Sequence, residues 1–213
     1  MFPDNFNCSL VVSEDMIKKP LFQFIIFVFC VFPPNSYAVY YGPSDEQIRQ
    51  AIEYGEKNKD ADYTTFLSEW MTVSNDGYEW AALNTKFSIL AYEAKNAALN
   101  MKKLTNTEII SLLLEAEDIL SFRVVLYGNS ADFTKDYHAV LIYKDKYVQP
   151  VSEQNDINSR PASLGIRIPL LYRAVCRYDF PNYYIESDAE VVLVVMSPLN
   201  KERRFIFNLS DMR

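Results

Sequence analysis

The sequence predicts an α+β fold, in which an N-terminal helical segment of about four helices packs on a C-terminal antiparallel sheet or small β-sandwich of about six strands. The periodicity of the apolar residues supports this class, because the period is about 3.6 up to residue 117 and changes to 2 at residue 119. Helices and strands that occupy separate parts of a chain are typical of α+β proteins and not of alternating α/β proteins.

The first helix is expected to begin at Ser44 and to end near residue 59. Ser44-Asp45-Glu46-Gln47 is a capping-box pattern, in which the serine hydroxyl accepts a hydrogen bond from the amide of Gln47 and the glutamine side chain reaches back. A short second helix is predicted over 64–71. Its buried face would contain Phe66, Leu67 and Trp70.

The third and fourth helices are predicted over 79–103 and 105–117. The third carries apolar residues at spacings of three and four, which is the pattern of a helix with one buried face. These residues are Leu83, Phe87, Leu90, Ala94, Ala97 and Met101. The fourth begins with a second capping box, Thr105-Asn106-Thr107-Glu108. Both apolar stripes indicate core packing and not a cofactor site.

Strands are expected from residue 119 onwards. The first covers 119–127, and a hairpin joins 138–143 to 146–149 across Lys144-Asp145. Residues 152–169 contain Asn, Asp, Pro and Gly and are predicted to form a long irregular loop. Three further strands are predicted at 171–178, 189–196 and 203–209, the last two joined as a hairpin. The second of these is apolar on both sides, which predicts a central position in its sheet.

The start of the chain carries a separate signal. Residues 21–32 form an apolar run interrupted only by Gln23, and two lysines precede it. Two prolines follow, and then Ser36 and Ala38 supply small residues at positions −3 and −1 of a cleavage site. This order predicts a secretory signal peptide that is cleaved after Ala38. The alternative is a membrane anchor or a buried core helix, but the run has about 12 residues and a spanning helix needs about 20.

Residues 1–38 are therefore predicted to be a signal peptide with a mis-called N-terminal extension, because Met16 makes a more ordinary start of translation. Residues 39–213 are predicted to form a single mature α+β domain, with a helical part at 44–117 and a strand part at 119–209. The predicted location is secreted or periplasmic. No stable membrane anchor is expected after cleavage.

The composition excludes several kinds of function. The net charge of −7 provides no electrostatic basis for binding nucleic acid. One His and three Cys leave no zinc-site spacing, so no metal and no cofactor are expected. After cleavage only Cys176 would remain, which rules out an intramolecular disulfide. The chain has no glycine-rich phosphate loop and no Gly-x-Ser-x-Gly motif.

His138 and Asp136 are the candidate catalytic residues, because a histidine at the start of a strand beside a carboxylate is suited to acid–base chemistry. Residues 137–142 resemble the histidine strand of papain-like hydrolases, which implies a cysteine nucleophile upstream at the start of a helix. The mature chain would have no cysteine upstream. Cys176 lies in the middle of a predicted strand, where alternation places it in the core, so a structural role is expected for it.

Aromatic residues make up 15% of the chain, and several of them gather in residues 178–184. Pro181 and Asn182 interrupt the strand there and are expected to place some of these aromatics in a loop. Exposed tyrosines combine a large apolar face with a polar tip and anchor protein partners or sugar rings. The candidate binding residues are Tyr178, Phe180, Tyr183 and Tyr184.

These observations favour an exported, soluble bacterial protein that acts as a non-enzymatic binding or interaction module in the cell envelope, with an envelope protein or glycan as its partner. The alternative is an exported hydrolase that uses carboxylates or His138 in a groove between helices and sheet. Glycosidase chemistry needs two carboxylates beside a cleft, and Glu115-Glu117-Asp118 is the one acidic cluster at a helix end. Convergence of His138 with the loops at 128–137 and 152–169 on one pocket would favour the hydrolase.

Overall fold

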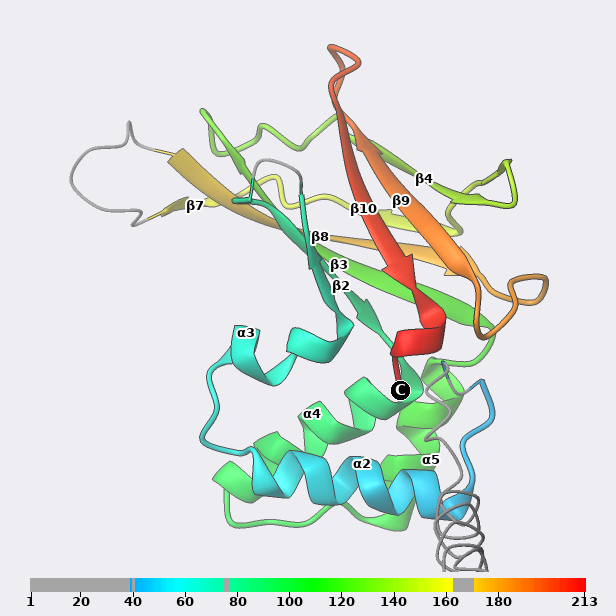
Figure 1. Cartoon of the computed structure of the whole chain (residues 1–213). Helices are drawn as coiled ribbons and strands as arrows, with labels where there is room; N and C mark the ends of the chain where they lie inside the picture. The colour runs from blue at the N-terminus through cyan, green and yellow to red at the C-terminus, as the bar shows by residue number, and fades with distance from the viewer. Residues whose placement is uncertain (1–38, 40, 75–76, 163–170) are drawn as a thin grey trace, which may run out of the picture. The chain divides into compact units, whose positions relative to one another are not determined.

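The computed structural model describes residues 39, 41–74, 77–162 and 171–213. The predicted signal peptide, its cleavage site and the proposed start at Met16 lie outside the described residues. The described part combines helices with two antiparallel sheets, which confirms the α+β class (Figure 1). No helix in it is both long enough and apolar enough to cross a membrane.

Each of the three longer helices begins at a capping box. In helix α2 (Asp45–Lys57) the amide of Ser44 donates to Gln47 Oε1 at 2.8 Å, and the amide of Gln47 donates back to Ser44 Oγ. Helix α5 (Asn106–Glu115) is capped in the same way by Thr105, so both predicted helix starts are confirmed. The short helix α3 (Tyr63–Phe66) is followed by the 3₁₀ turn η2 (Ser68–Trp70), where a single short helix was predicted.

The predicted third helix is wrong in its first part. Residues Trp80–Asn84 form strand β2, which pairs with β1 (Met71–Val73) on one side and with β3 on the other. The first four residues of β2 are all buried, so the run has no exposed face that would distinguish a strand from a helix. Helix α4 (Lys86–Leu99) starts only after Thr85, whose side chain caps it. Two strands therefore precede α4, and the predicted order of helices followed by strands is not found.

The strands form a six-stranded and a four-stranded sheet. Sheet A has the order β1-β2-β3-β8-β6, with β7 also paired to β8, and sheet B has the order β10-β9-β4-β5. Sheet A adds β3 (Ile119–Gly128), β6 (Ser152–Gln154), β7 (Arg160–Ala162) and β8 (Leu171–Pro181) to β1 and β2. Sheet B contains β4 (His138–Tyr143), β5 (Lys146–Val148), β9 (Glu190–Met196) and β10 (Glu202–Asn208). The predicted loop at 152–169 thus contains two short strands, whereas both predicted hairpins are confirmed.

The main core lies between the two sheets. The even-numbered residues of β3 from Leu120 to Leu126 face it and are almost completely buried, as are Phe205 and Phe207 of β10. The Phe122 and Phe207 rings, one from each sheet, have their centroids 5.0 Å apart. Strand β9 lies between β10 and β4, in the central position that was predicted for it. The odd-numbered residues of β3 and β8 face the other side of sheet A, where Arg173, Val175 and Arg177 of β8 are exposed and Val125 of β3 is completely buried.

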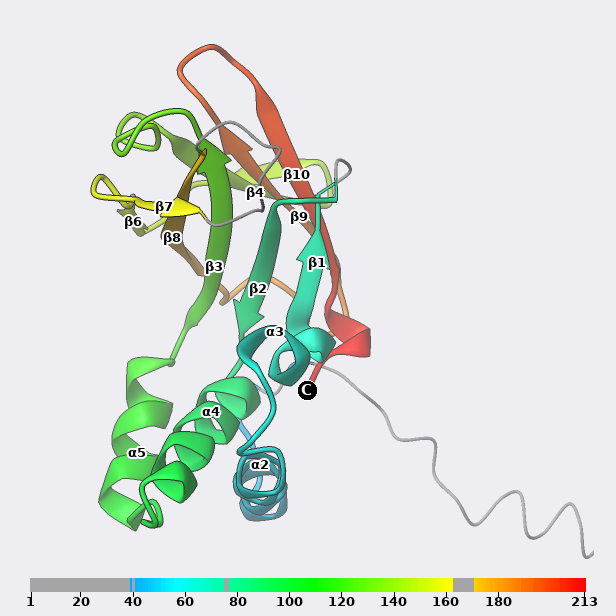
Figure 2. The same cartoon turned by 90° about the vertical axis from the view of Figure 1, so that its left-hand side faces the viewer.

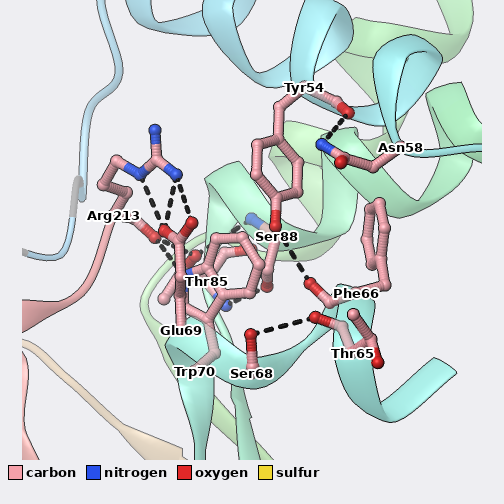
Figure 3. Close-up of polar contacts among 10 residues, drawn as sticks. All are labelled: Tyr54, Asn58, Thr65, Phe66, Ser68, Glu69, Trp70, Thr85, Ser88 and Arg213. Atoms are coloured by element: carbon pink, nitrogen blue, oxygen red, sulfur yellow. Dashed lines mark hydrogen bonds and ion pairs between the residues drawn. The ribbon is translucent and has the colours of Figure 1, made fainter. Parts of the chain in front are cut away.

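Helices α2, α4 and α5 lie at one end of the two sheets and do not cover a face of them (Figures 1 and 2). Arg213, which follows β10 in the chain, contacts η2 and the start of α4, as Figure 3 shows. Its carbonyl oxygen accepts hydrogen bonds from Trp70 Nε1 at 2.8 Å and from Thr85 Oγ1 at 2.5 Å. Its guanidinium pairs with Glu69 and lies 4.7 Å from the centroid of the Phe87 ring.

Candidate functional site

Two arginines face each other on the outer side of sheet A. In the antiparallel register of β3 and β8, Arg123 is the direct partner of Arg177. Side chains of directly opposed residues have Cβ atoms about 4.5–5.5 Å apart, and like charges in this arrangement destabilise a sheet. The two guanidinium groups therefore concentrate positive charge at one point of an acidic protein, and a bound anion would reduce the repulsion between them.

These arginines form the sheet side of a pocket of about 230 Å³. Its other walls are α4 and α5, which lie at the end of sheet A where β3 leaves α5 (Figure 2). Tyr63 of α3 and Tyr92 of α4 contribute two phenol rings to the lining. The pocket therefore lies between helices and sheet, and Glu115 of the acidic cluster predicted from the sequence lines it.

The two arginines have different partners. Arg177 Nε donates to Asp179 Oδ1 at 2.9 Å, so part of its charge is neutralised by a buried carboxylate. Arg123 donates to the hydroxyl of Tyr63 at 2.6 Å and lies 5.7 Å from the centroid of its ring. No carboxylate within the described ranges lies within 4.0 Å of the Arg123 guanidinium.

Tyr63 is a second hydrogen-bond donor at this site. Burial raises the pKa of its hydroxyl, although the positive charges of Arg123 and Arg173 act in the opposite direction. The hydroxyl therefore stays protonated at neutral pH. Because the hydroxyl accepts a hydrogen bond from Arg123, its own proton remains available for an acceptor in the pocket.

The helical wall of the pocket carries the opposite charge. Glu93 of α4 and Glu115 of α5 both line it. Glu115 accepts a hydrogen bond from the Ser111 hydroxyl at 3.4 Å, and neither carboxylate forms an ion pair with a described residue. The pocket is thus positive on its sheet side and negative on its helix side, which restricts an anion to the sheet side.

His138 and Asp136 do not lie in this pocket. The His138 side chain is 71% exposed, and its Nδ1 lies 3.0 Å from Glu153 Oε2. The other oxygen of Glu153 accepts from the amide of Ala139, so the contact ties β4 to β6 across the two sheets. The loops at 128–137 and 152–169 do converge in their described parts, because the amide of Ser159 donates to Ala131. Asp136 is exposed and is not part of the hollow beside His138.

The four candidate binding aromatics separate into two pairs. Tyr178 and Phe180 are fully buried and point into the core, so they are not available to a partner at the surface. They belong to β8, which ends at Pro181, so the predicted break at Pro181 and Asn182 comes after both residues. Tyr183 is 77% exposed and Tyr184 is 43% exposed, and their ring centroids lie 4.7 Å apart. Only this second pair is placed where it was expected.

Cys176 is fully buried on β8, as the alternation in the sequence predicted. Burial raises the pKa of its thiol, which disfavours the nucleophilic thiolate. Its neighbours on the same face, Ala174 and Tyr178, are equally buried. The structure therefore places Cys176 in a packing role.

Arg123, Arg177 and Glu93 were not among the site residues predicted from the sequence. A signal was present, because each arginine is a charged residue at an outward position of a strand whose inward positions are apolar. Alternation of this kind is usual for a strand with one solvated face, so it does not by itself distinguish a site. The opposition of the two arginines depends on the strand register, which brings together residues far apart in the sequence.

The described part of the chain contains no group of three or more His, Cys, Asp or Glu side chains arranged to hold a metal ion. No family model matches the chain, and no curated protein matches it either.

Proposed function

We propose that the protein is an exported binding module of the cell envelope that holds an anionic group, such as the carboxylate of an envelope glycan, between Arg123 and Arg177. The observation that supports this function is the direct opposition of the two arginines in a pocket that also contains a protonated phenol. Guanidinium groups bind carboxylates through paired hydrogen bonds, and a neutral hydroxyl adds a third donor.

A carboxylated monosaccharide tests this proposal. Glucuronate is titrated into protein purified from cells that express the whole chain, with glucose as the uncharged control and chemical-shift changes as the readout. Glucuronate should bind and glucose should not. Arg123→Gln should weaken glucuronate binding by about tenfold to hundredfold, because a hydrogen bond to a charged group contributes about 1.5–3 kcal/mol.

Arg204→Gln is the matched control for loss of one positive charge. Arg204 is exposed on sheet B and pairs with Glu202 of the same strand. Its replacement should leave glucuronate binding within twofold of the unmodified protein. Equal affinities for glucuronate in the Arg123→Gln and Arg204→Gln proteins would contradict the proposal.

A hydrolase is the second candidate, and the carboxylates of Glu93 and Glu115 favour it. Two carboxylates beside a cleft are the requirement of glycoside hydrolysis. If this alternative is correct, incubation with a bound acidic oligosaccharide should release new reducing ends. Glu115→Gln should abolish that release while Ser111→Ala, which removes only the hydrogen-bond partner of Glu115, should preserve most of it. Recovery of the intact oligosaccharide would eliminate the hydrolase.

A further inference from the structure

A second pair of opposed arginines lies on the same face of sheet A. In the register of β7 and β8, Arg160 is the direct partner of Arg173. Both side chains are exposed, and they border an open hollow of about 590 Å³ together with Tyr127. The fold thus repeats the unfavourable arrangement of Arg123 and Arg177 at another point of one sheet.

The second pair has no ion-pair partner among the described residues, although one carboxylate borders the same hollow. Neither Arg160 nor Arg173 forms an ion pair with any described residue. Asp156 also borders the hollow, but its carboxylate accepts hydrogen bonds from the backbone amides of Asn158 and Val175 at 3.1 and 3.2 Å. This carboxylate is therefore already engaged with backbone donors.

The two arginine pairs belong to one surface. Arg173 and Arg177 are four residues apart on β8, and side chains at even spacing along a strand share a face. At about 3.3 Å per residue the Cα atoms of Arg173 and Arg177 are about 13 Å apart. Val175, which is 37% exposed, lies between them.

From this geometry we infer that the ligand is a linear acidic oligosaccharide with widely spaced carboxylates, which extends along the outer face of sheet A and contacts both arginine pairs. The inference rests on the proposed function and identifies its ligand class. A separation of about 13 Å exceeds the length of one monosaccharide, so only an oligosaccharide reaches both pairs. Tyr127 lies directly opposite Arg173 and supplies an aromatic surface for a sugar ring.

The charges around the pocket set the direction of this oligosaccharide. Glu93 and Glu115 line the helix side of the first pocket and repel a further anionic unit beyond Arg123. One end of the oligosaccharide therefore lies at Arg123 and Arg177, and the rest of it extends toward Arg160 and Arg173.

The same surface is a poor match for a nucleic acid. A duplex carries one phosphate about every 3.4 Å along each strand. Several phosphates would then lie between the two arginine pairs, where the exposed residue of β8 is the uncharged Val175. An acidic oligosaccharide whose carboxylates are spaced like the arginine pairs avoids this mismatch, so it is favoured over a nucleic acid.

Length dependence of binding tests the inference. Hyaluronan hexasaccharide, which has one carboxylate per disaccharide, is compared with glucuronate by isothermal titration calorimetry on the purified whole protein. The hexasaccharide should bind at least tenfold more tightly, because its second carboxylate binds at a high effective concentration once the first is held. Arg173→Gln and Arg160→Gln should each reduce this advantage to less than threefold, and Arg204→Gln should preserve it. Circular dichroism of each variant verifies the fold.

The outcomes separate this inference from the proposed function. If glucuronate and the hexasaccharide bind equally and both depend on Arg123, the ligand ends at the first pair, so the inference is wrong and the proposed function stands. If Arg123→Gln changes neither affinity, the proposed function is wrong as well. Tighter binding of hexathymidylate than of the hexasaccharide would identify a nucleic acid as the ligand and overturn the oligosaccharide.

Discussion

Asp62 shows how local hydrogen bonds set the chemistry of a single side chain. It precedes α3, and its Oδ1 accepts hydrogen bonds from the amides of Thr64 and Thr65. The hydroxyls of the same two threonines donate to Oδ1 and Oδ2 at 2.7 and 2.6 Å. These contacts, led by the Thr65 hydroxyl, hold the pKa of Asp62 well below its ordinary value. The ionised form is thereby favoured in the folded protein.

Because the pKa is lower in the folded state than in the unfolded state, the stabilisation by Asp62 is fully present above about pH 4. It is lost as the pH falls through the folded-state pKa. Asp62→Asn keeps an N-cap side chain but removes the titration. The difference in unfolding free energy between the two proteins, measured in urea, should therefore shrink between pH 5 and pH 2.

Asp60→Asn is the control for this pH dependence, since Asp60 is exposed and lies two residues before the cap. Its urea stability should remain parallel to that of the unmodified protein from pH 5 to pH 2. If the free energy of unfolding of Asp62→Asn also stayed parallel to that of the unmodified protein, the carboxylate of Asp62 would not contribute to the pH dependence of stability.

At the scale of elements, the packing of α2 on α4 depends on a close approach at Gly55. A Cβ atom at this position would lie 2.1 Å from the carbonyl oxygen of Ala91 and 2.9 Å from Ala94 Cβ. Gly55 is buried, and Ala91 is completely buried. The alanines of α4, which the sequence analysis placed on its buried face, permit this approach from the other side.

Gly55→Ala should lower the free energy of unfolding by about 1–3 kcal/mol, because overpacking forces the two helices apart. Alanine otherwise stabilises a helix relative to glycine, so the sign of the change reports the contact itself. Gly42→Ala is the control, since a Cβ at Gly42 meets no atom within 4 Å. A more stable Gly55→Ala protein in urea unfolding would rule out the close packing of α2 on α4.

At the scale of the whole molecule, a buried ion pair connects the two sheets. Arg203 of β10 donates to Glu79 Oε2 at 2.7 Å, and the two side chains are only 9% and 7% exposed. The other oxygen of Glu79 accepts from the amide of Tyr127 in sheet A. The Arg203 guanidinium also lies 5.2 Å from the centroid of the Tyr137 ring. Glu79 therefore holds strands of both sheets at one point.

Glu79→Ala should lower the free energy of unfolding by about 3–5 kcal/mol, because it leaves the Arg203 charge buried without its partner. Glu202→Ala is the control on the same strand, where an exposed carboxylate pairs with Arg204. Its replacement should change stability by less than about 1 kcal/mol. Similar losses in the two variants would mean that burial does not distinguish these ion pairs.

The sequence by itself determined the features that depend on neighbours in the chain. A capping box needs residues only three positions apart, and the starts of α2 and α5 at Ser44 and Thr105 were predicted from it. The hairpin turn at Lys144-Asp145 and the burial of Cys176 likewise follow from local alternation and turn length. The α+β class follows from the same periodicities.

Tertiary structure decided the features that depend on distant residues. Strand β2 is buried on both faces between two other strands, so its apolar run had no period to reveal it. The arginine pairs arise because long-range pairing brings Arg123 to Arg177 and Arg160 to Arg173. Strand register is set by the burial of whole faces in the folded protein, which explains why the sequence shows each arginine but not its opposition to another.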